Sequence, residues 1–259
     1  MPFGHFFISL MNTENSHNPS LIDRLFAVGA HFGFTKSRRH PTTAPYLYGN
    51  KQGTDIFDLE KTSELLATAK AIIEEAGKNG KKVLFVGTKE EASQLVRKAA
   101  EEAESSYVVN RWIGGMLTNF GEIKKRIQRL IDLNTQGASG ELERKYTKKE
   151  RVVIGRELEK LTFNFGGIQT LDRAPQLMVV VDPRHDAIAV QEATHLKIPV
   201  IGIASSDTNI AHITHPVLVN DALQASIRFI LDELVAAYRA GKAAYVPVKH
   251  TDRKAVPQK

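Results

Sequence analysis

The chain has 259 residues, of which 42% are hydrophobic and 25% charged, a composition typical of a globular protein with a buried core rather than of a disordered chain. It contains no cysteine, which excludes disulfide bonds, thiolate metal sites and a cysteine nucleophile. The formal net charge of +6 favours polyanionic partners, and no apolar run reaches the roughly 18 residues that cross a bilayer, which excludes a membrane-spanning protein.

The first 20 residues are predicted to be a flexible extension. Phe6, Phe7 and Ile8 form an apolar patch, but neither a basic region nor a small-residue cleavage site accompanies it, unlike in a signal peptide. Met11 is an alternative start. Apolar residues at helical spacing then predict a short helix from residue 21 that breaks at Gly29.

A basic loop follows over residues 31–53. Its prolines and glycines, with alternating Tyr46 and Tyr48, predict a loop and a small hairpin. No acidic residue occurs between Arg24 and Lys51, so the stretch concentrates positive charge. We expect contacts to nucleic-acid phosphates from Lys36, Arg38, Arg39 and Lys51.

Helices then alternate with buried strands. The apolar spacing predicts a helix over residues 60–77, a strand over 82–86, a helix that follows a turn at 87–89 and runs through residue 103, and a strand over 107–109. This alternation indicates a parallel sheet with helices on its faces.

The turn Gly87-Thr88-Lys89 joins a strand to a helix N-terminus, a position that binds phosphate in many proteins. It has neither the Gly-x-x-x-x-Gly-Lys-Ser/Thr nor the Gly-x-Gly-x-x-Gly pattern. Two interpretations stay open. One is an α/β enzyme that binds a nucleotide or phosphorylated ligand there, and the other is an ordinary turn whose Lys89 meets an RNA phosphate.

Residues 111–119 are the most unusual stretch, because the only tryptophan, Trp112, lies beside Arg111 and precedes Gly114 and Gly115. One interpretation is a structural junction at which Trp112 packs and the glycines allow close backbone approach. The other is a phosphate contact by Arg111 and exposed backbone. Both can hold together, and Thr118-Asn119 is expected to cap the next helix.

Residues 118–165 contain no credible buried strand and predict a protruding helical hairpin that bends at residues 137–140. The predicted apolar faces are Ile123, Ile127, Leu130 and Ile131 in the first helix, and Val153, Leu158 and Leu161 in the second. The outer face of the first helix is strongly basic. We expect RNA contacts there from Asn119, Lys124, Lys125 and Arg126.

The second half returns to strands at residues 177–181 and 200–204, a candidate strand at 218–219, and helices at 187–196 and 221–240. Asp182, Asp186 and Asp207 follow strands, where α/β enzymes place catalytic carboxylates, but turns and helix caps are their commoner roles. No catalytic constellation or metal-binding histidine pair can be assembled. Residues 241–259 are predicted to be a basic flexible tail.

The motifs resemble those of the small-subunit ribosomal protein S-two family of bacteria and organelles. The similar segments are VGAHFG (28–33), DLEKT (58–62), LFVGTK (84–89), RWIGGMLTN (111–119), LEKL (158–161), GGI (166–168) and IPV (198–200). They keep the family's order within residues 21–240. Phe34 departs from the pattern, since many relatives have a histidine there, and residues 207–221 are also altered.

This resemblance implies an α/β protein: a parallel-sheet domain of Rossmann or flavodoxin type, formed by residues 21–117 and 166–240, with an inserted coiled-coil hairpin at 118–165. It implies a cytoplasmic, non-enzymatic constituent of the small ribosomal subunit that binds ribosomal RNA where head meets body.

The resemblance also implies neighbouring ribosomal proteins as partners, including the mRNA-binding ribosomal protein S-one where it exists. No cofactor, metal, membrane or small-molecule substrate is expected. Charge reversal of Arg38 and Arg39 is expected to weaken incorporation into subunits and to leave the isolated fold intact.

Overall fold

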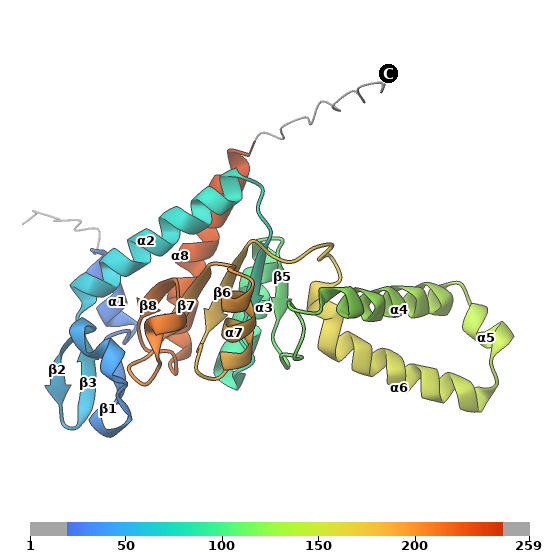
Figure 1. Ribbon diagram of the computed structural model, residues 1–259, viewed down its shortest axis with the longest axis horizontal. Helices are drawn as coiled ribbons and strands as arrows, with labels where there is room; N and C mark the ends of the chain where they lie inside the picture. Colours follow the sequence, from blue (N-terminus) through green and yellow to red (C-terminus); the bar gives the residue numbers. More distant parts are fainter. Residues whose placement is uncertain (1–19, 246–259) are drawn as a thin grey trace, which may run out of the picture.

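The computed structural model describes residues 20–245, which contain two sheets (Figure 1). The larger has five parallel strands in the order β5-β4-β6-β7-β8, and the smaller has three antiparallel strands in the order β1-β3-β2. The small sheet lies at one end of the long axis, and a helical hairpin extends from the other end (Figure 1). The predicted α/β class with a parallel sheet is confirmed.

The parallel sheet forms from short apolar runs that are buried on both faces, as parallel sheets require. Its strands are β4 (Val83–Val86), β5 (Ser106–Val108), β6 (Leu177–Val181), β7 (Val200–Ala204) and β8 (His215–Leu218). The bounds of β6 and β7 agree with the prediction, whereas β8 lies mostly before the predicted residues.

Alternate residues of each strand face opposite helical layers. Val83 and Phe85 pack in a core cluster with α2 (Leu59–Lys78), α3 (Glu90–Glu102) and α8 (Gln224–Ala243). Leu84 and Val86 belong to a second cluster with α7 (Ala187–His195) and the base of the hairpin. Both faces of the sheet are therefore covered.

The helices α2 and α8 pack closely because each has a glycine where they cross. A Cβ added to Gly241 would lie 2.1 Å from the backbone oxygen of Glu74, and one added to Gly77 would lie 2.5 Å from that of Tyr238. Neither position has room for a side chain. The two backbones can approach this closely only because both residues are glycine.

The small sheet follows α1 (Leu21–Ala27) and consists of β1 (Phe32–Thr35), β2 (Leu47–Lys51) and β3 (Thr54–Phe57). The predicted hairpin is β2 and β3. The strand β1 was not predicted, because its residues are exposed or half-buried and show no alternation of apolar and polar types. Two 3₁₀ helices, η1 (Lys36–Arg38) and η2 (Pro41–Tyr46), connect β1 to β2.

The hairpin between β5 and β6 comprises α4 (Phe120–Ala138), the short α5 (Glu141–Lys145) and α6 (Lys148–Phe165). The chain turns at Gly140, whose φ is +70°. Ile123, Ile127 and Leu130 are buried as predicted. The 3₁₀ helices η3 (Gly166–Ile168) and η4 (Ile210–His212) lie elsewhere in the second half of the chain.

Three details of the predicted hairpin are wrong. Ile131, predicted on the apolar face of the first helix, is 38% exposed. Val153 is 60% exposed, and its neighbour Ile154 packs against the core instead, because one residue turns a helix by about 100°. Asn119 occupies the cap position of α4, but its side chain makes no capping hydrogen bond.

The predicted terminal extensions fall mostly outside the described residues. Ser20 is described, and its hydroxyl accepts a hydrogen bond from the backbone N–H of Asp23 at the start of α1. At the other end α8 continues to Ala243, so the predicted tail begins inside a helix. Between Ser20 and Tyr245 no helix is both long and apolar enough to cross a membrane.

Candidate nucleic-acid interface

Two lysines at the tip of the small sheet have free ammonium groups. Lys36 begins η1 and Lys51 ends β2, and both side chains are exposed. The backbone N–H of Lys36 donates to the carbonyl of Gly53 at 3.0 Å, which ties η1 to the β2–β3 turn. Neither lysine forms an ion pair within residues 20–245, so both charges are available to an external anion.

Arg39, by contrast, is bound internally. Its Nε donates to Oδ2 of Asp55 at 2.7 Å and its Nη2 to Oδ1, and the carboxylate of Asp55 is completely buried. These hydrogen bonds from Arg39 hold the pKa of Asp55 below its usual value, against the effect of burial. Arg39 therefore stabilises the fold by neutralising Asp55, and its guanidinium is not free to bind a phosphate. Reversing its charge would leave Asp55 buried beside a like charge, so we now expect reversal of Arg38 and Arg39 to destabilise the isolated fold as well.

Arg38 is half exposed and also has internal partners. Its Nη2 donates to Oδ2 of Asp207 at 3.3 Å, and its guanidinium lies over the ring of Phe34, 4.5 Å from the centroid. Arg184 binds the same carboxylate oxygen of Asp207. Two arginines on one carboxylate leave an excess positive charge at this surface.

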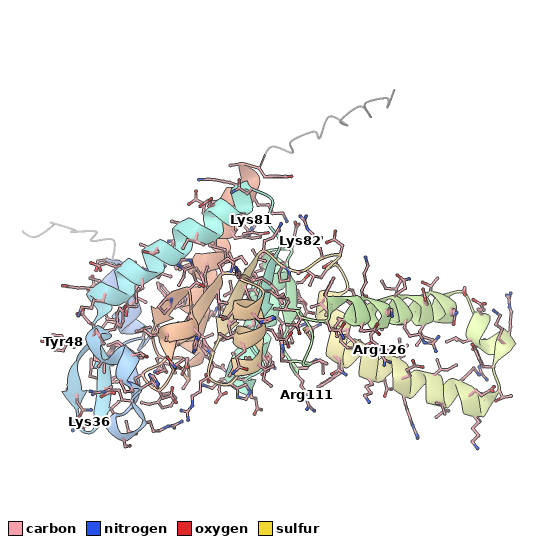
Figure 2. The ribbon with its side chains drawn as sticks, in the orientation of Figure 1. Lys36, Tyr48, Lys81, Lys82, Arg111 and Arg126 are labelled. Atoms are coloured by element: carbon pink, nitrogen blue, oxygen red, sulfur yellow. The ribbon has the colours of Figure 1, made fainter. Side chains whose placement is uncertain are left out.

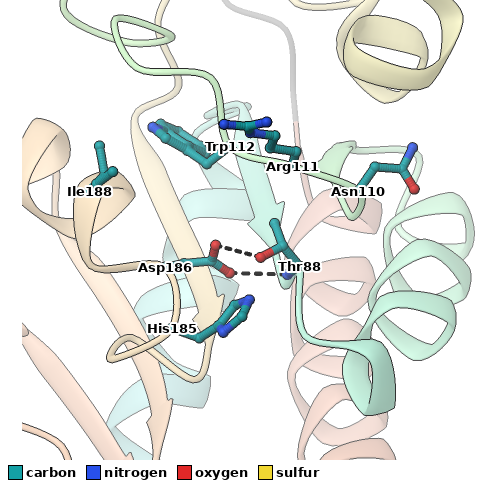
Figure 3. Close-up of a pocket in the computed structure, with 7 residues that line it drawn as sticks. All are labelled: Thr88, Asn110, Arg111, Trp112, His185, Asp186 and Ile188. Carbon is teal, nitrogen blue, oxygen red and sulfur yellow. Dashed lines mark hydrogen bonds between the residues drawn. The ribbon is translucent and has the colours of Figure 1, made fainter. Parts of the chain in front are cut away.

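The turn Gly87-Thr88-Lys89 already contains an anion, the buried carboxylate of Asp186. The backbone N–H of Thr88 donates to Oδ2 of Asp186 at 3.0 Å and its hydroxyl to Oδ1 at 2.7 Å (Figure 3). A phosphate would need the same N–H and hydroxyl. These donors are occupied, so the structure gives the turn no free phosphate site.

A pocket of about 240 Å³ lies beside this turn, lined by Thr88, Asn110, Arg111, Trp112, His185, Asp186 and Ile188 (Figure 3). Burial raises the pKa of Asp186, although the hydrogen bonds from Thr88 oppose the rise. The pocket is smaller than most ligand pockets, and its one buried carboxylate is used by the turn. It does not supply a catalytic constellation.

Lys89 is largely buried and pairs with acidic groups of the same edge of the sheet. Its Nζ lies 3.0 Å from Oδ2 of Asp182, 3.2 Å from the backbone oxygen of Asp221 and 3.6 Å from Oδ1 of Asp221. Burial disfavours the charged amine, but Asp221 and Asp182 outweigh it and raise the pKa of Lys89. The ammonium group is thus committed to the interior rather than to a phosphate.

The segment from Trp112 to Thr118 is held by one buried carboxylate, Glu192 of α7. Its Oε1 accepts from Nε1 of Trp112 at 3.1 Å and from the N–H of Gly115 at 2.8 Å. Its Oε2 accepts from the N–H groups of Leu117 and Thr118 at 2.9 and 3.1 Å, and from the Thr118 hydroxyl at 3.1 Å. The backbone that was considered for phosphate contact is therefore already hydrogen-bonded.

These hydrogen bonds define the junction between the sheet and α4. Gly115 has a φ of +85°, which favours glycine, and Trp112 is 8% exposed within the second core cluster. Gly114, in contrast, is exposed, with open space where a Cβ would lie. Burial opposes ionisation of Glu192, but the hydrogen bonds prevail and lower its pKa. Nothing in the sequence distinguishes this glutamate from one on the surface of α7.

Arg111 and Asn119 flank this junction and have exposed side chains. In Figure 2, Arg111 lies between the small sheet and the hairpin. It forms no ion pair with any residue of the described part of the chain. Arg111 therefore presents a free cation where the sheet meets α4.

The predicted cations of α4 differ in their partners. Lys124 and Arg126 are exposed and make no ion pair within residues 20–245, whereas Lys125 pairs with Glu122 at 2.5 Å. Arg129, further along, pairs with Glu157 of α6 at 3.2 Å. Surface pairs of this kind are weak, so Lys125 remains able to exchange its partner.

The predicted RNA-binding residues thus do not form one patch. Lys36 lies on the small sheet and Arg126 near the base of the hairpin, with Arg111 between them (Figure 2). Among the predicted contacts, Lys36, Lys51, Arg111, Lys124 and Arg126 make no ion pair within residues 20–245, while Arg39 and Lys89 are held by buried carboxylates. An extended polyanion fits this arrangement better than a small ligand.

Comparison with known proteins identifies the family. A family model described as ribosomal protein S2 matches residues 25–241. The chain belongs to the ribosomal protein S2 family. The small ribosomal subunit protein uS2 of Thermus thermophilus is 42% identical over 214 residues, 83% of each chain. That of Mesoplasma florum is 40% identical over 219 residues, covering 85% of this chain and 82% of the relative. The uS2c protein of Rhodomonas salina is 39% identical over 228 residues, covering 88% and 93%.

Membership of the S2 family makes the chain a structural constituent of the ribosome, not an enzyme, and places it with the ribosome in the cytoplasm. The open alternative of a nucleotide-binding α/β enzyme is thereby wrong. The physical reason lies at the turn Gly87-Thr88-Lys89, where Asp186, Asp182 and Asp221 occupy the groups that a phosphate would need. In this S2 family member the polar side chains at the strand ends bind one another and stabilise the fold, instead of binding a substrate.

Proposed function

We propose that the chain binds the ribosomal RNA of the small subunit where the head meets the body, and that it helps to dock neighbouring ribosomal proteins. Where the mRNA-binding ribosomal protein S-one is present, it is one of these neighbours. The names of the relatives support a place in the small subunit. The unpaired cations on the small sheet, at the junction and on α4 support RNA as the direct partner.

The observation that carries the proposal is the contrast between used and unused cations. Arg39 and Lys89 neutralise buried carboxylates, whereas Lys36, Lys51 and Arg111 are exposed with no acidic partner among residues 20–245. The one acid of the small sheet, Asp55, is already neutralised. Unpaired cations at a rigid tip contact phosphates and 2′-hydroxyls of folded RNA without reading its sequence.

The second proposed contact is the hairpin. Lys124 and Arg126 present free charges on α4. Asn119 precedes this helix and Lys125 lies within it, and both belong to the same proposed contact. Residues 118–165 contain eleven basic and seven acidic side chains. We propose that this hairpin, predicted as a coiled coil, lies along RNA and that the α/β domain of residues 21–117 and 166–240 supports it.

The test is charge reversal of the two free lysines of the small sheet, Lys36→Glu with Lys51→Glu. Small subunits lacking this protein are mixed with the variant, and its occupancy is measured on sucrose gradients by mass spectrometry at increasing salt. Because two phosphate contacts are lost, occupancy should fall and the dependence of log affinity on log salt should become shallower by about 1 to 2.

The matched control reverses Arg97 and Lys98 of α3, which are equally exposed but already pair with Glu101 and Glu102. This control should bind like the wild type. Wild-type occupancy in the lysine variant, with an unchanged salt slope, would rule out the small sheet as an RNA contact.

A further inference from the structure

Tyr48 is the most exposed of the large apolar side chains in the described residues. Its side chain is 84% exposed, against 62% for Phe26 and 57% for Phe163. No other aromatic ring stacks on it within residues 20–245. Figure 2 shows Tyr48 pointing away from the small sheet, on the end of the molecule remote from the hairpin. A ring exposed to this degree offers a whole face on which a partner can stack.

The exposure of Tyr48 is built into the backbone. In the β2–β3 ladder, Leu47 lies opposite Phe57 but Gly49 lies opposite Ile56, so Tyr48 is the extra residue of a β-bulge. A bulge re-aims a side chain and interrupts pairing, and β2 is an edge strand, with no further strand of the small sheet beside it. Leu47 packs against the second core cluster while Tyr48 is turned out to solvent.

The flank of the ring is open, and the strand that carries it ends in an unpaired lysine. A Cβ at the next residue, Gly49, would meet no atom within 4 Å, so nothing shields this flank of Tyr48. Lys51 ends the same strand with a free ammonium group, and the one acid of the small sheet, Asp55, is buried and neutralised by Arg39. An aromatic face beside free lysines is how proteins bind unpaired bases of single-stranded nucleic acid.

The same features disfavour a protein partner. Protein interfaces bury several apolar side chains around an aromatic anchor. The other exposed aromatic residue of the small sheet, Phe32, lies on the opposite edge strand, and its ring is 4.0 Å from that of His31. Tyr48 thus stands alone among glycine, asparagine and lysine.

We propose that Tyr48 stacks on an unpaired base of the small-subunit RNA, while Lys51 contacts a flanking phosphate. This inference rests on the proposed RNA-binding function and adds a binding site for a single flipped-out or loop base. The stack reads no particular base, since every base has a π-face. It gives the charged tip of the small sheet a fixed register on its RNA.

The test compares Tyr48→Phe, Tyr48→Leu and Tyr48→Ala in rebinding to small subunits that lack this protein. Tyr48→Phe keeps the ring and should bind like the wild type. Tyr48→Leu keeps apolar bulk but loses the π-face, and both it and Tyr48→Ala should bind about 5- to 100-fold more weakly. Their salt slope should stay that of the wild type, because no charge is lost, whereas Lys51→Gln should make it shallower.

A photoreactive phenylalanine analogue at position 48 then identifies the partner, and we expect a cross-link to an RNA nucleotide. A cross-link to a neighbouring protein, or wild-type affinity in Tyr48→Leu and Tyr48→Ala, overturns the stacking proposal while the salt-dependent binding of the wild type stands. Wild-type protein that fails to rebind overturns the RNA-binding function itself, and the stacking site with it. All three side-chain variants should unfold like the wild type, since Tyr48 makes few contacts.

Discussion

At the scale of single residues, Glu192 holds the backbone at the start of the hairpin. It is buried and accepts hydrogen bonds from Trp112, Gly115, Leu117 and Thr118. We predict that Glu192→Ala lowers the free energy of unfolding by about 1–3 kcal/mol, because several buried donors lose their acceptor. Urea unfolding followed by the fluorescence of Trp112 measures this loss.

Gln191→Ala, at the exposed neighbouring position, is the control and should change stability little. Because the hydrogen bonds lower the pKa of Glu192 in the folded state, its contribution is present above its unfolded pKa and is lost as pH falls through the folded value. Equal stability of Glu192→Ala and the control would show that water replaces the carboxylate at no cost.

Asp221 has the opposite titration. It is completely buried, and no hydrogen-bond donor within residues 20–245 reaches either of its carboxylate oxygens. Burial, reinforced by the charge of Asp182, raises the pKa of Asp221 to about 7 despite Lys89. The folded state therefore keeps a proton that the unfolded state, with a pKa of about 3.9, has released.

The contribution of Asp221 to the free energy of unfolding should accordingly fall as pH rises from about 4 to 7 and then level off. We predict that Asp221→Asn removes this slope and is more stable than the wild type at pH 7. Asp232→Asn, an exposed aspartate of α8, is the control. Unfolding free energies measured across this pH range would contradict the prediction if Asp221→Asn and the wild type showed the same slope.

At the scale of the elements, the contact between α2 and α8 depends on two glycines. We predict that Gly241→Ala lowers stability by about 1–3 kcal/mol or more, because its Cβ would lie 2.1 Å from the backbone oxygen of Glu74. The loss should occur although alanine favours a helix over glycine by about 1 kcal/mol. Thermal or urea unfolding of the purified variant measures it.

Gly155 provides the matched control, since it lies inside α6 with open space around its Cβ position. Gly155→Ala should therefore gain stability by up to about 1 kcal/mol, through helix propensity alone. If both alanine variants shifted stability in the same direction, the close crossing of α2 and α8 would not be limiting.

The elements also show what the sequence can and cannot predict. The strands β6 and β7 were predicted at their bounds because continuous apolar runs with turn residues at their ends have one interpretation in an alternating pattern. The strand β1 was missed because its half-buried residues carry no such pattern. Val153 was placed inward since apolar spacing alone does not fix the phase of a helix face whose apolar residues, Val152, Val153 and Ile154, are consecutive.

The candidate site was predicted less well, because pairing depends on tertiary structure. Lys36 and Lys89 look alike in the sequence, yet one is free and the other is held by Asp182 and Asp221, which lie more than ninety residues later in the chain. Likewise, no local sequence pattern indicates that Arg39 pairs with a buried aspartate or that Glu192 accepts hydrogen bonds from the loop at residues 112–118. The basic composition predicts that lysines and arginines contact RNA, but only the fold indicates which of them lack an internal ion-pair partner.

At the scale of the whole molecule, the unpaired cations of the predicted contacts are spread along the long axis: Lys36 lies on the small sheet, Arg126 near the base of the hairpin, and Arg111 between them (Figure 2). Lys124 and Arg126 lie in the first two turns of α4, and the parallel sheet lies between this end of the hairpin and the small sheet (Figure 1). Substitutions at sites this far apart normally add in free energy. A rigid protein that binds one RNA structure through both sites should show this additivity in affinity.

We therefore predict that reversing Lys36 and Lys51 together with Lys124 and Arg126 weakens binding to depleted subunits by the product of the two separate factors. The salt slope should likewise fall by the sum of the two separate changes, because each pair releases its own counterions. The four-residue variant, the two pairwise variants and the wild type form one cycle, measured at a single salt concentration and then across a series. The prediction fails if the four-residue variant binds no more weakly than the weaker-binding of the two pairwise variants. In that case only one of the two sites contacts RNA, and the charges of the other serve solubility or a protein neighbour instead.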